Sequence, residues 1–209
     1  MTVTIQDFVN ERGIKYLLHF TQIGNLPSIM ANGLLTRNQC LARRIVPLTN
    51  DVYRLDHEDA LSLSVSFPNY KMFYQVRQSH PDLQWAILAL RASVLWEKRV
   101  AFCRQNAAKA AVASIPIEQR MGLQALKGMF GDFEEKVRAE MRLPPDYPTH
   151  PQAEVLVFDR IEPAHIIGVA FDDSALKNQY AAQYAGFDFR YIPRFFKYRQ
   201  DYAQWKANG

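Results

Sequence analysis

The sequence has little of what metal, phosphate and covalent catalytic sites are usually built from. Its 209 residues include two cysteines, Cys40 and Cys103, which have neither the spacing of a metal site nor the number of a disulfide framework. The five histidines, at positions 19, 57, 80, 150 and 165, do not pair at ligand spacing. The phosphate-binding glycine loops, the nucleophile elbow and the H-E-x-x-H helix are also missing. We therefore expect no metal and none of the enzyme classes that these motifs define.

Long apolar segments and flexible linkers are missing too. No stretch approaches the roughly 20 apolar residues of a membrane span, and residues 1–18 lack the basic start and apolar segment of a signal peptide. No repeat, low-complexity tract or Gly/Ser linker divides the chain. We expect a soluble, cytoplasmic protein without a membrane partner, in which residues 1–209 form a single domain. Nothing in the sequence requires more than a monomer.

What is present includes a mild excess of positive charge. The formal net charge is +4, which permits a nucleic-acid partner without requiring one. Near the C-terminus, cations alternate with aromatic rings, as single-stranded nucleic acid prefers for phosphate pairing and base stacking. A C-terminal segment that docks its aromatic side chains on the core would show the same pattern, so both alternatives stay open. The residues concerned are Arg190, Tyr191, Arg194, Phe195, Phe196, Lys197, Tyr198, Arg199, Tyr202 and Trp205.

Hydrophobic periodicity predicts short strands mixed with helices. Several strands follow one another without a crossover helix, which favours an α+β fold over a doubly wound sheet. Thr4 is a candidate helix cap, and Gly13 and Gly33 are candidate helix stops. The full prediction places helices at 4–13, 25–33 and 173–184, strands at 15–21, 60–67, 84–90, 153–158 and 166–171, a helix-rich region at 102–127 and a long loop at 128–151.

One carboxylate stands out, at the start of the stretch "HPQAEVLVF" over residues 150–158. If 153–158 is a strand, Gln152 and Glu154 project from the same face. Burying an unpaired carboxylate is costly, so we expect Glu154 at a strand end that faces a cleft or a partner. The alternative is a solvent-facing position on an edge strand.

Four stretches appear in a fixed order: "HFTQIGNLPSIMANGLL" at 19–35, "SVSFPNYKMFY" at 64–74, "FCRQNAA" at 102–108 and "QAEVLVF" at 152–158. Together they resemble the DarT family of bacterial toxins, NAD-dependent ADP-ribosyltransferases that modify DNA bases. The resemblance extends from His19 to Phe158. It implies an ADP-ribosyltransferase-like α+β fold in which NAD is clamped between a split pair of mixed sheets flanked by helices.

The resemblance also implies roles for individual residues. Glu154 resembles the catalytic glutamate of the family, and the loop before it resembles a substrate-recognition loop. The NAD-binding set implied by the first strand is His19, Thr21 and Asn25. Arg54 resembles the arginine that braces the NAD phosphates or the target, with Arg43 and Arg44 as rivals.

The residue types fit such a reaction. A carboxylate beside the ribose stabilises the positive charge that develops when the nicotinamide bond breaks, and it can take a proton from the acceptor. Tyr70 or Tyr74 is expected to lie against the nicotinamide ring, and Gln152 to contact the acceptor. A base can be reached only when unstacked, which favours single-stranded DNA. Arg138 and Arg142, in the loop, are expected to contact it together with the C-terminal residues.

The resemblance therefore implies a mono-ADP-ribosyltransferase, with NAD as co-substrate, that acts as the toxin of a toxin–antitoxin pair with an ADP-ribosyl-glycohydrolase antitoxin. Thymine-modifying members carry a "YVPFYF…PM" strand and turn where this chain has "LSLSVSFPNYKM" at 61–72, so the resemblance is closer to the guanine-modifying branch. Gln152, two residues before Glu154, also resembles the pattern of protein-modifying transferases, which leaves RNA or protein acceptors as an alternative. A non-catalytic nucleic-acid-binding module is the third.

Overall fold

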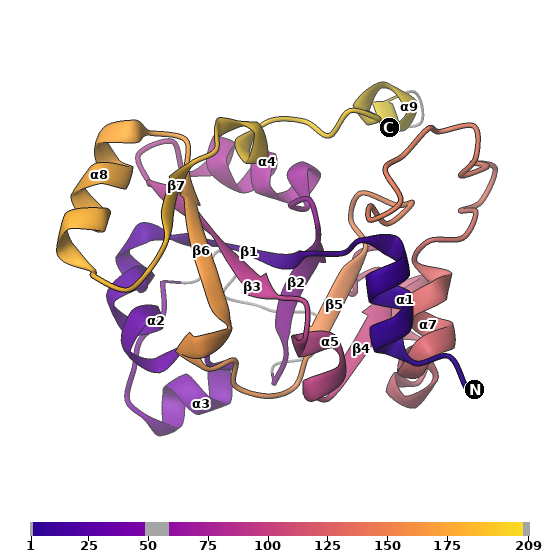
Figure 1. Ribbon diagram of the computed structural model, residues 1–209, viewed down its shortest axis with the longest axis horizontal. Helices are drawn as coiled ribbons and strands as arrows, with labels where there is room; N and C mark the ends of the chain where they lie inside the picture. Colours follow the sequence, from indigo (N-terminus) through magenta and orange to yellow (C-terminus); the bar gives the residue numbers. More distant parts are fainter. Residues whose placement is uncertain (1, 49–58, 207–209) are drawn as a thin grey trace.

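The computed structural model describes residues 2–48 and 59–206, and these contain a central seven-stranded sheet (Figure 1). The strand order is β4-β5-β2-β1-β3-β6-β7, and every neighbouring pair is antiparallel except β6 and β7. The α+β class is confirmed. The strands are β1 (Tyr16–Gln22), β2 (Leu61–Val65), β3 (Trp85–Arg91), β4 (Val100–Cys103), β5 (Glu154–Val157), β6 (Ile166–Phe171) and β7 (Phe189–Tyr191).

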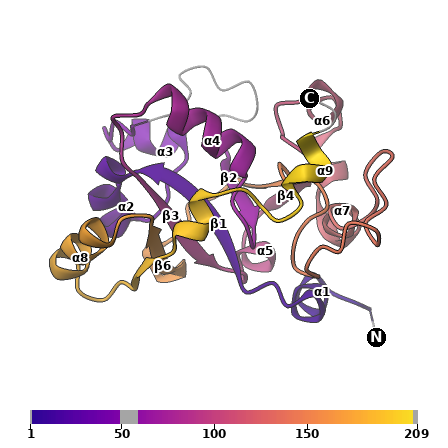
Figure 2. The same ribbon diagram turned by 90° about the horizontal axis from the view of Figure 1, so that it is seen from above.

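The helices are short and surround the sheet (Figures 1 and 2). None in the described part of the chain is long and apolar enough to cross a membrane. They are α1 (Ile5–Arg12), α2 (Leu26–Asn32), α3 (Arg37–Ala42), α4 (Tyr70–Ser79), α5 (Val94–Glu97), α6 (Ala110–Ala113), α7 (Gly122–Gly128), α8 (Ser174–Gln183) and α9 (Tyr202–Lys206).

The predicted helix signals act as expected. Thr4 and Asp7 form a reciprocal capping box at the start of α1, and Gly13 ends the helix in the left-handed conformation. Gly33 ends α2 with φ 77° and ψ −172°, a region open essentially to glycine alone. A Cβ at Gly33 would also overlap the carbonyl of Ile161, where Leu34 and Ile161 exchange two backbone hydrogen bonds of 2.9 and 3.0 Å.

The two faces of the sheet are covered differently. The larger core lies on the face packed by α1, α2, α5, α7 and α8, and residues of all seven strands of the described sheet point into it. The opposite face has two smaller cores. One packs α4 and the turn Pro193–Phe196 on β1, β3 and β6, and the other packs α6 on β4 and β5.

The sheet opens between β1 and β2. These strands pair only at Leu17–Val65 and Leu18–Ser64, whereas β1 pairs with β3 over all seven of its residues. Beyond Leu18 the two strands therefore separate, and their edges are exposed to the space between them. This opening corresponds to the expected split of the sheet.

The region predicted to be helix-rich, from residue 102 to residue 127, is helical only in part, since it contains α6, the helical turn Ile117–Arg120 and most of α7. Phe102 and Cys103 belong to β4, and the alanine-rich segment forms only the four-residue helix α6. Asn106 explains the shortness, because its side chain accepts the backbone N–H of Ala108 at 2.9 Å. The N–H of Ala107 donates to Glu154 Oε2 at 2.9 Å instead of to a helical carbonyl, so one local and one long-range side-chain bond override the helical propensity of alanine. The predicted loop before β5 is confirmed, since no helix and no strand of the sheet lies between α7 and β5.

Candidate active site

A cavity of about 510 Å³ lies where β1 and β2 separate, within the usual range for small-molecule sites. Four consecutive residues of β1, Leu18 to Thr21, and four of β2, Leu61 to Ser64, line it. Successive residues of a strand point to opposite faces, so they line one cavity only along the edge of a strand. The opening in the sheet therefore forms the site. Helices α2 and α3, the start of α4, Asn106, Ala108 and Glu154 complete the lining.

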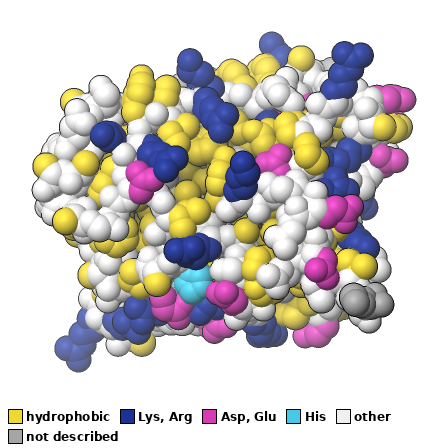
Figure 3. All heavy atoms as spheres, viewed as in Figure 1, with side chains coloured by type: hydrophobic (Ala, Val, Ile, Leu, Met, Phe, Trp, Pro, Cys, Tyr) yellow, Lys and Arg dark blue, Asp and Glu magenta, His cyan; other side chains and the backbone are white. Residues whose placement is uncertain are grey.

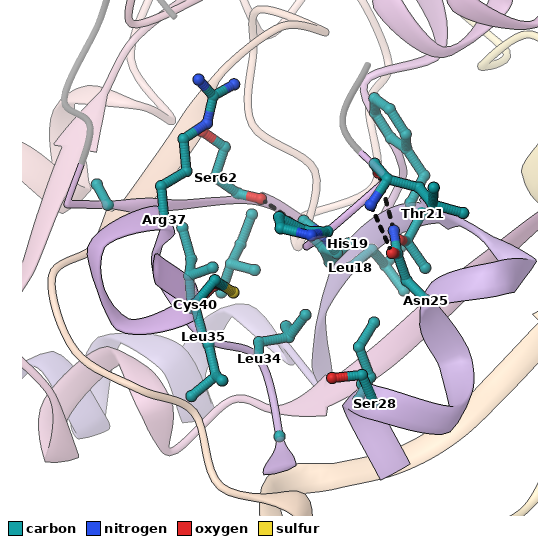
Figure 4. Close-up of a pocket in the computed structure, with 18 of the residues that line it drawn as sticks. Leu18, His19, Thr21, Asn25, Ser28, Leu34, Leu35, Arg37, Cys40 and Ser62 are labelled. Atoms are coloured by element: carbon teal, nitrogen blue, oxygen red, sulfur yellow. Dashed lines mark hydrogen bonds between the residues drawn. The ribbon is translucent and has the colours of Figure 1, made fainter. Parts of the chain in front are cut away.

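His19 bridges the opening in the sheet (Figure 4). Its Nδ1 lies 3.0 Å from the carbonyl oxygen of Ser62 on β2. A carbonyl can only accept, so Nδ1 carries the proton and the orientation of the imidazole ring is fixed. His19 lines the cavity, and its contact with NAD stays a prediction.

Thr21 and Asn25 form a second fixed group on the other side of His19 in Figure 4. Asn25 donates from Nδ2 to Thr21 Oγ1 at 3.0 Å and to the carbonyl of Leu48 at 2.9 Å. Its Oδ1 accepts the N–H of Leu48 at 2.8 Å. One amide thus ties β1 to the chain at Leu48, and the three predicted residues His19, Thr21 and Asn25 come together in one cavity.

Glu154 lies at the first position of β5 and is only 6% exposed. Strand β5 lies between β4 and β2, so the alternative of a solvent-facing residue on an edge strand is wrong. The carboxylate lines the cavity and accepts the N–H of Ala107. A backbone donor and a rigid strand position offset part of the cost of burying it.

The arginine of the cavity is one that the sequence analysis did not select. Arg37, at the start of α3, is the only lysine or arginine lining the cavity among the described residues. Arg43 and Arg44 are exposed and outside the lining, so the structure does not bring these rivals to the site. Arg54 lies outside the described residues.

Tyr70 and Tyr74 do not line the cavity, contrary to the expectation of a nicotinamide contact. Tyr70 is 3% exposed and packs on Tyr198 and Tyr202, with ring centroids 5.9 and 6.2 Å apart. Tyr74 packs on Tyr198 at 5.7 Å. Positions 70 and 74 share one face of α4, since residues four apart are neighbours on a helix. The lining residues Asn69 and Met72 are three apart and belong to a different face.

Gln152 and the two loop arginines also lie outside the lining. Because β5 begins at Glu154, Gln152 lies in a turn, and strand alternation does not place it beside the carboxylate. Arg138 donates to Thr149 Oγ1 and to the carbonyls of Pro144 and Pro145, at 3.0 to 3.3 Å. Arg142 is exposed. The structure therefore uses Arg138 to fold the loop.

The remaining polar lining had a partial signal in the sequence. The serines at 62 and 64 alternated with apolar residues, which marked one polar face of a strand without saying that the strand would border a cavity. Ser28 and Asn106 gave no comparable signal. Among the described residues no three His, Cys, Asp or Glu side chains gather as a metal site would require.

Comparison with known proteins identifies the family. The family model described as "ssDNA thymidine ADP-ribosyltransferase, DarT" matches residues 18–190. No curated protein matches. Among solved structures, Thermosipho africanus DarTG in complex with ADP-ribose is 18% identical with a TM-score of 0.60, and the match covers 87% of this chain and 51% of that one. The chain thus spans about half the length of the Thermosipho protein.

Two further structures cover nearly the full length of their own chains. Thermus sp. 2.9 DarT in complex with NAD+ is 15% identical with a TM-score of 0.54, over 88% of this chain and 98% of that one. The same protein in complex with ADP-ribosylated ssDNA is 12% identical with a TM-score of 0.56, over 88% and 97%. At these identities the structures show a shared fold, and the family model covers most of the sequence. The chain belongs to the DarT family of single-stranded-DNA ADP-ribosyltransferases.

Proposed function

We propose that this chain transfers ADP-ribose from NAD to a base in single-stranded DNA. The observation that carries the proposal is the cavity in the split sheet, which is lined by a buried glutamate, a histidine of fixed orientation and an arginine. Membership of the DarT family and the fold shared with DarT bound to NAD+ and to ADP-ribosylated ssDNA support it.

The cavity residues suggest how NAD would be held. His19, whose Nδ1–H is engaged by Ser62, presents its ring to ribose hydroxyls. Arg37 supplies a guanidinium suited to the pyrophosphate. Thr21 and Asn25 hold the wall of the cavity through their mutual bond and the bonds to Leu48. Such prior fixing of orientation can contribute about 7–11 kcal/mol to catalysis.

Glu154 would act on the ribose that carries nicotinamide. The bond between C1′ and the nicotinamide nitrogen breaks, the electron pair leaves with nicotinamide, and positive charge develops on the ribose. A carboxylate held rigidly beside it stabilises that charge. A nitrogen of the base then bonds to C1′, and its proton passes to Glu154 as general base or to water.

We further propose that guanine, rather than thymine, is the acceptor. The support is the stretch at 61–72, which departs from the strand and turn of thymine-modifying members and forms β2 and the start of α4 on the cavity wall. The family model is described for thymidine, so thymine is the competing acceptor. Oligonucleotides that lack guanine, and others that lack thymine, separate the two.

The Thermosipho structure is named DarTG, which supports a toxin role and an antitoxin partner for this chain. An antitoxin that removes ADP-ribose from DNA would be a glycohydrolase. Induction of the chain in a bacterial host, alone and with such a hydrolase, tests the proposal. Growth arrest that requires Glu154 and is relieved by the hydrolase is the expected result.

Mass spectrometry of mixed-sequence single-stranded oligonucleotides, after incubation with the protein and NAD, tests the reaction itself. One added ADP-ribose per modified strand, absent with Glu154→Gln, is expected, and fragmentation then identifies the base. Binding of NAD without a DNA adduct would move the acceptor to RNA or protein. If the protein forms no adduct and does not bind NAD, a non-catalytic nucleic-acid-binding module is the function that remains.

A further inference from the structure

The C-terminal segment 199–205 lies against the long loop that leads to Glu154. Figures 1 and 2 show α9, in yellow, beside this loop, which runs from residue 129 to residue 153. On its other side the segment contacts α4, where Lys71 Nζ donates to the carbonyl of Trp205 at 3.3 Å. The segment therefore fills the space between α4 and the loop.

Arg199 makes the direct bonds to the loop. Its guanidinium is 3% exposed and donates to the carbonyls of Pro148 and Thr149 at 2.9 and 2.8 Å. Thr149 is in turn held by its own N–H, which donates to the carbonyl of Met129 at 2.9 Å, and by Arg138, which donates to its hydroxyl. Thr149 is thus fixed five residues before Glu154.

Asp201 fixes Arg199 in turn. Its carboxylate accepts two N–H bonds from Arg199, at 2.6 and 2.5 Å, and one from Trp205 Nε1 at 2.7 Å. The parallel pair of N–H bonds is the geometry in which arginine binds carboxylates most strongly. Charges taken out of water are costly unless every polar atom is satisfied, and this arrangement of arginine, aspartate and tryptophan meets that condition.

Ring contacts extend the connection to the residues next to Glu154. The ring of His150 lies 4.7 Å from that of Trp205 and 4.5 Å from that of Phe133, between centroids. His150 Nδ1 accepts the N–H of Gln152 at 3.1 Å. A continuous series of contacts therefore connects Trp205, through His150, to Gln152, which lies two residues before Glu154.

The loop lies outside the cavity and leads directly into Glu154. Residues 129–153 contribute nothing to the cavity lining, whereas Glu154 does. NAD fills the cavity in the proposed function, so the acceptor base must approach the ribose from outside it, and the loop is the segment outside the lining that continues directly into Glu154.

We propose that Arg199, Asp201 and Trp205 are positioning residues for the acceptor side of the active site. They hold the loop in one arrangement, and they do not contribute to NAD binding. The proposal rests on the proposed function. It predicts that loosening the clamp, defined as these three residues, reduces transfer to DNA while NAD binding and hydrolysis persist.

The test uses the full chain with Arg199→Lys, which keeps the charge and removes the guanidinium fork, and with Trp205→Phe, which keeps the ring and removes the Nε1 donor. Arg91→Lys is the matched control, because Arg91 also donates to a backbone carbonyl, that of Ala164 at 3.2 Å, but at an exposed site at the end of β3. We expect the ratio of DNA transfer to NAD hydrolysis to fall about 10- to 100-fold in both clamp variants, with the KM for NAD unchanged. The control should keep the ratio of the wild type.

Hydrogen exchange of residues 129–153 is the second readout, and it does not depend on catalysis. Faster exchange in the loop, with unchanged exchange in β1 and β3, is expected for both clamp variants. If the wild-type protein transfers nothing, the proposed function fails while hydrogen exchange still tests the clamp. Unchanged exchange in the loop, or an equal fall in transfer and hydrolysis, would overturn the proposal.

Discussion

The cavity side and the loop side of Glu154 differ in how far apart in the sequence their hydrogen-bonded residues lie. On the cavity side, the bonds of Asn25 and His19 join residues between 4 and 43 positions apart. On the loop side, Arg199 bonds to Thr149 across 50 positions and Lys71 to Trp205 across 134. Most of the residues that line the cavity lie between positions 18 and 72, although the bridge from Leu34 to Ile161 is a long-range bond on this side too. The loop, in contrast, depends on the far end of the chain.

Charge differs between the two sides as well. The described lining of the cavity has one guanidinium and one carboxylate, whereas the loop side contains several cations close to aromatic rings. On the face shown in Figure 3, lysine and arginine side chains are interspersed with acidic and hydrophobic ones and do not form one patch. The C-terminal segment docks only part of its side chains on the rest of the protein, and contact of the others with nucleic acid stays a prediction. Phe195, Phe196, Arg199 and Trp205 are buried, and Tyr191, Arg194, Lys197 and Tyr198 remain exposed.

The largest effect is expected where the two sides meet, at Glu154. Glu154→Gln removes the charge but leaves an oxygen that can accept the N–H of Ala107. Loss of a group that stabilises transition-state charge costs about 100- to 1,000-fold in rate. Initial rates of transfer and of NAD hydrolysis should both fall, with thermal stability close to that of the wild type. Retained hydrolysis with lost transfer would place Glu154 with the acceptor instead.

The next largest effect is expected on the free energy of unfolding, from a substitution on the cavity side. Gly33→Ala places a Cβ at a backbone conformation reserved for glycine and against the carbonyl of Ile161. We expect a loss of about 3 kcal/mol in the free energy of unfolding, measured in urea.

Gly13→Ala is the control for that change. Gly13 also has a positive φ, of 68°, but nothing lies within 4 Å of an added Cβ. A loss of about 1 kcal/mol is expected there. Equal losses at the two glycines would mean that the bridge between Leu34 and Ile161 does not constrain the cavity wall.

Sequence patterns described the cavity side better than the loop side for a physical reason. Helix caps, glycine stops and alternating strands are local, so α1, α2, β1 and β2 were predicted within a few residues, and the resemblance to the family added His19, Thr21 and Asn25 on β1 and the turn after it. The positions of Tyr70 and Tyr74 depend on where α4 begins relative to the tail. Nothing local in the sequence says that Arg199 bonds to the carbonyl of Thr149, 50 residues earlier, so the contact between the C-terminal segment and the loop could not be predicted from it.

A lower pH should reduce the stability of the folded protein through a histidine on the loop side, His150. Burial first, and then the nearby charges of Lys71 and Arg199, lower the pKa of His150 from 6.5 to about 3, although Asp201 raises it and Lys109 lowers it further. The unfolded chain then binds one more proton than the folded chain between these values, so stability falls as the pH drops below about 6.5. At pH 5 this amounts to about 2 kcal/mol.

Urea unfolding at pH 7 and pH 5 measures the effect. His150→Asn keeps an acceptor for the N–H of Gln152 but does not titrate. Its loss of stability between pH 7 and pH 5 should therefore be about 2 kcal/mol smaller than that of the wild type. His80→Asn, at an exposed histidine, should leave the pH dependence of the wild type unchanged. Identical pH dependence in the wild type and His150→Asn would mean that His150 is solvated and does not pack between Phe133 and Trp205.

The smallest effect tests whether the cavity side contains its own phosphate ligand. Arg37 lines the cavity, whereas Arg43 is exposed six residues later. One charge-assisted bond to a phosphate contributes about 1.5 kcal/mol, so Arg37→Gln should raise the KM for NAD about tenfold with little change in kcat, and Arg43→Gln should change neither. If Arg37→Gln leaves the KM unchanged, the phosphate ligand must be sought elsewhere, with Arg54 as the first candidate. The cavity side would then also depend on a residue outside the continuous stretch that lines it. The difference between the two sides in the sequence separation of their residues would be smaller.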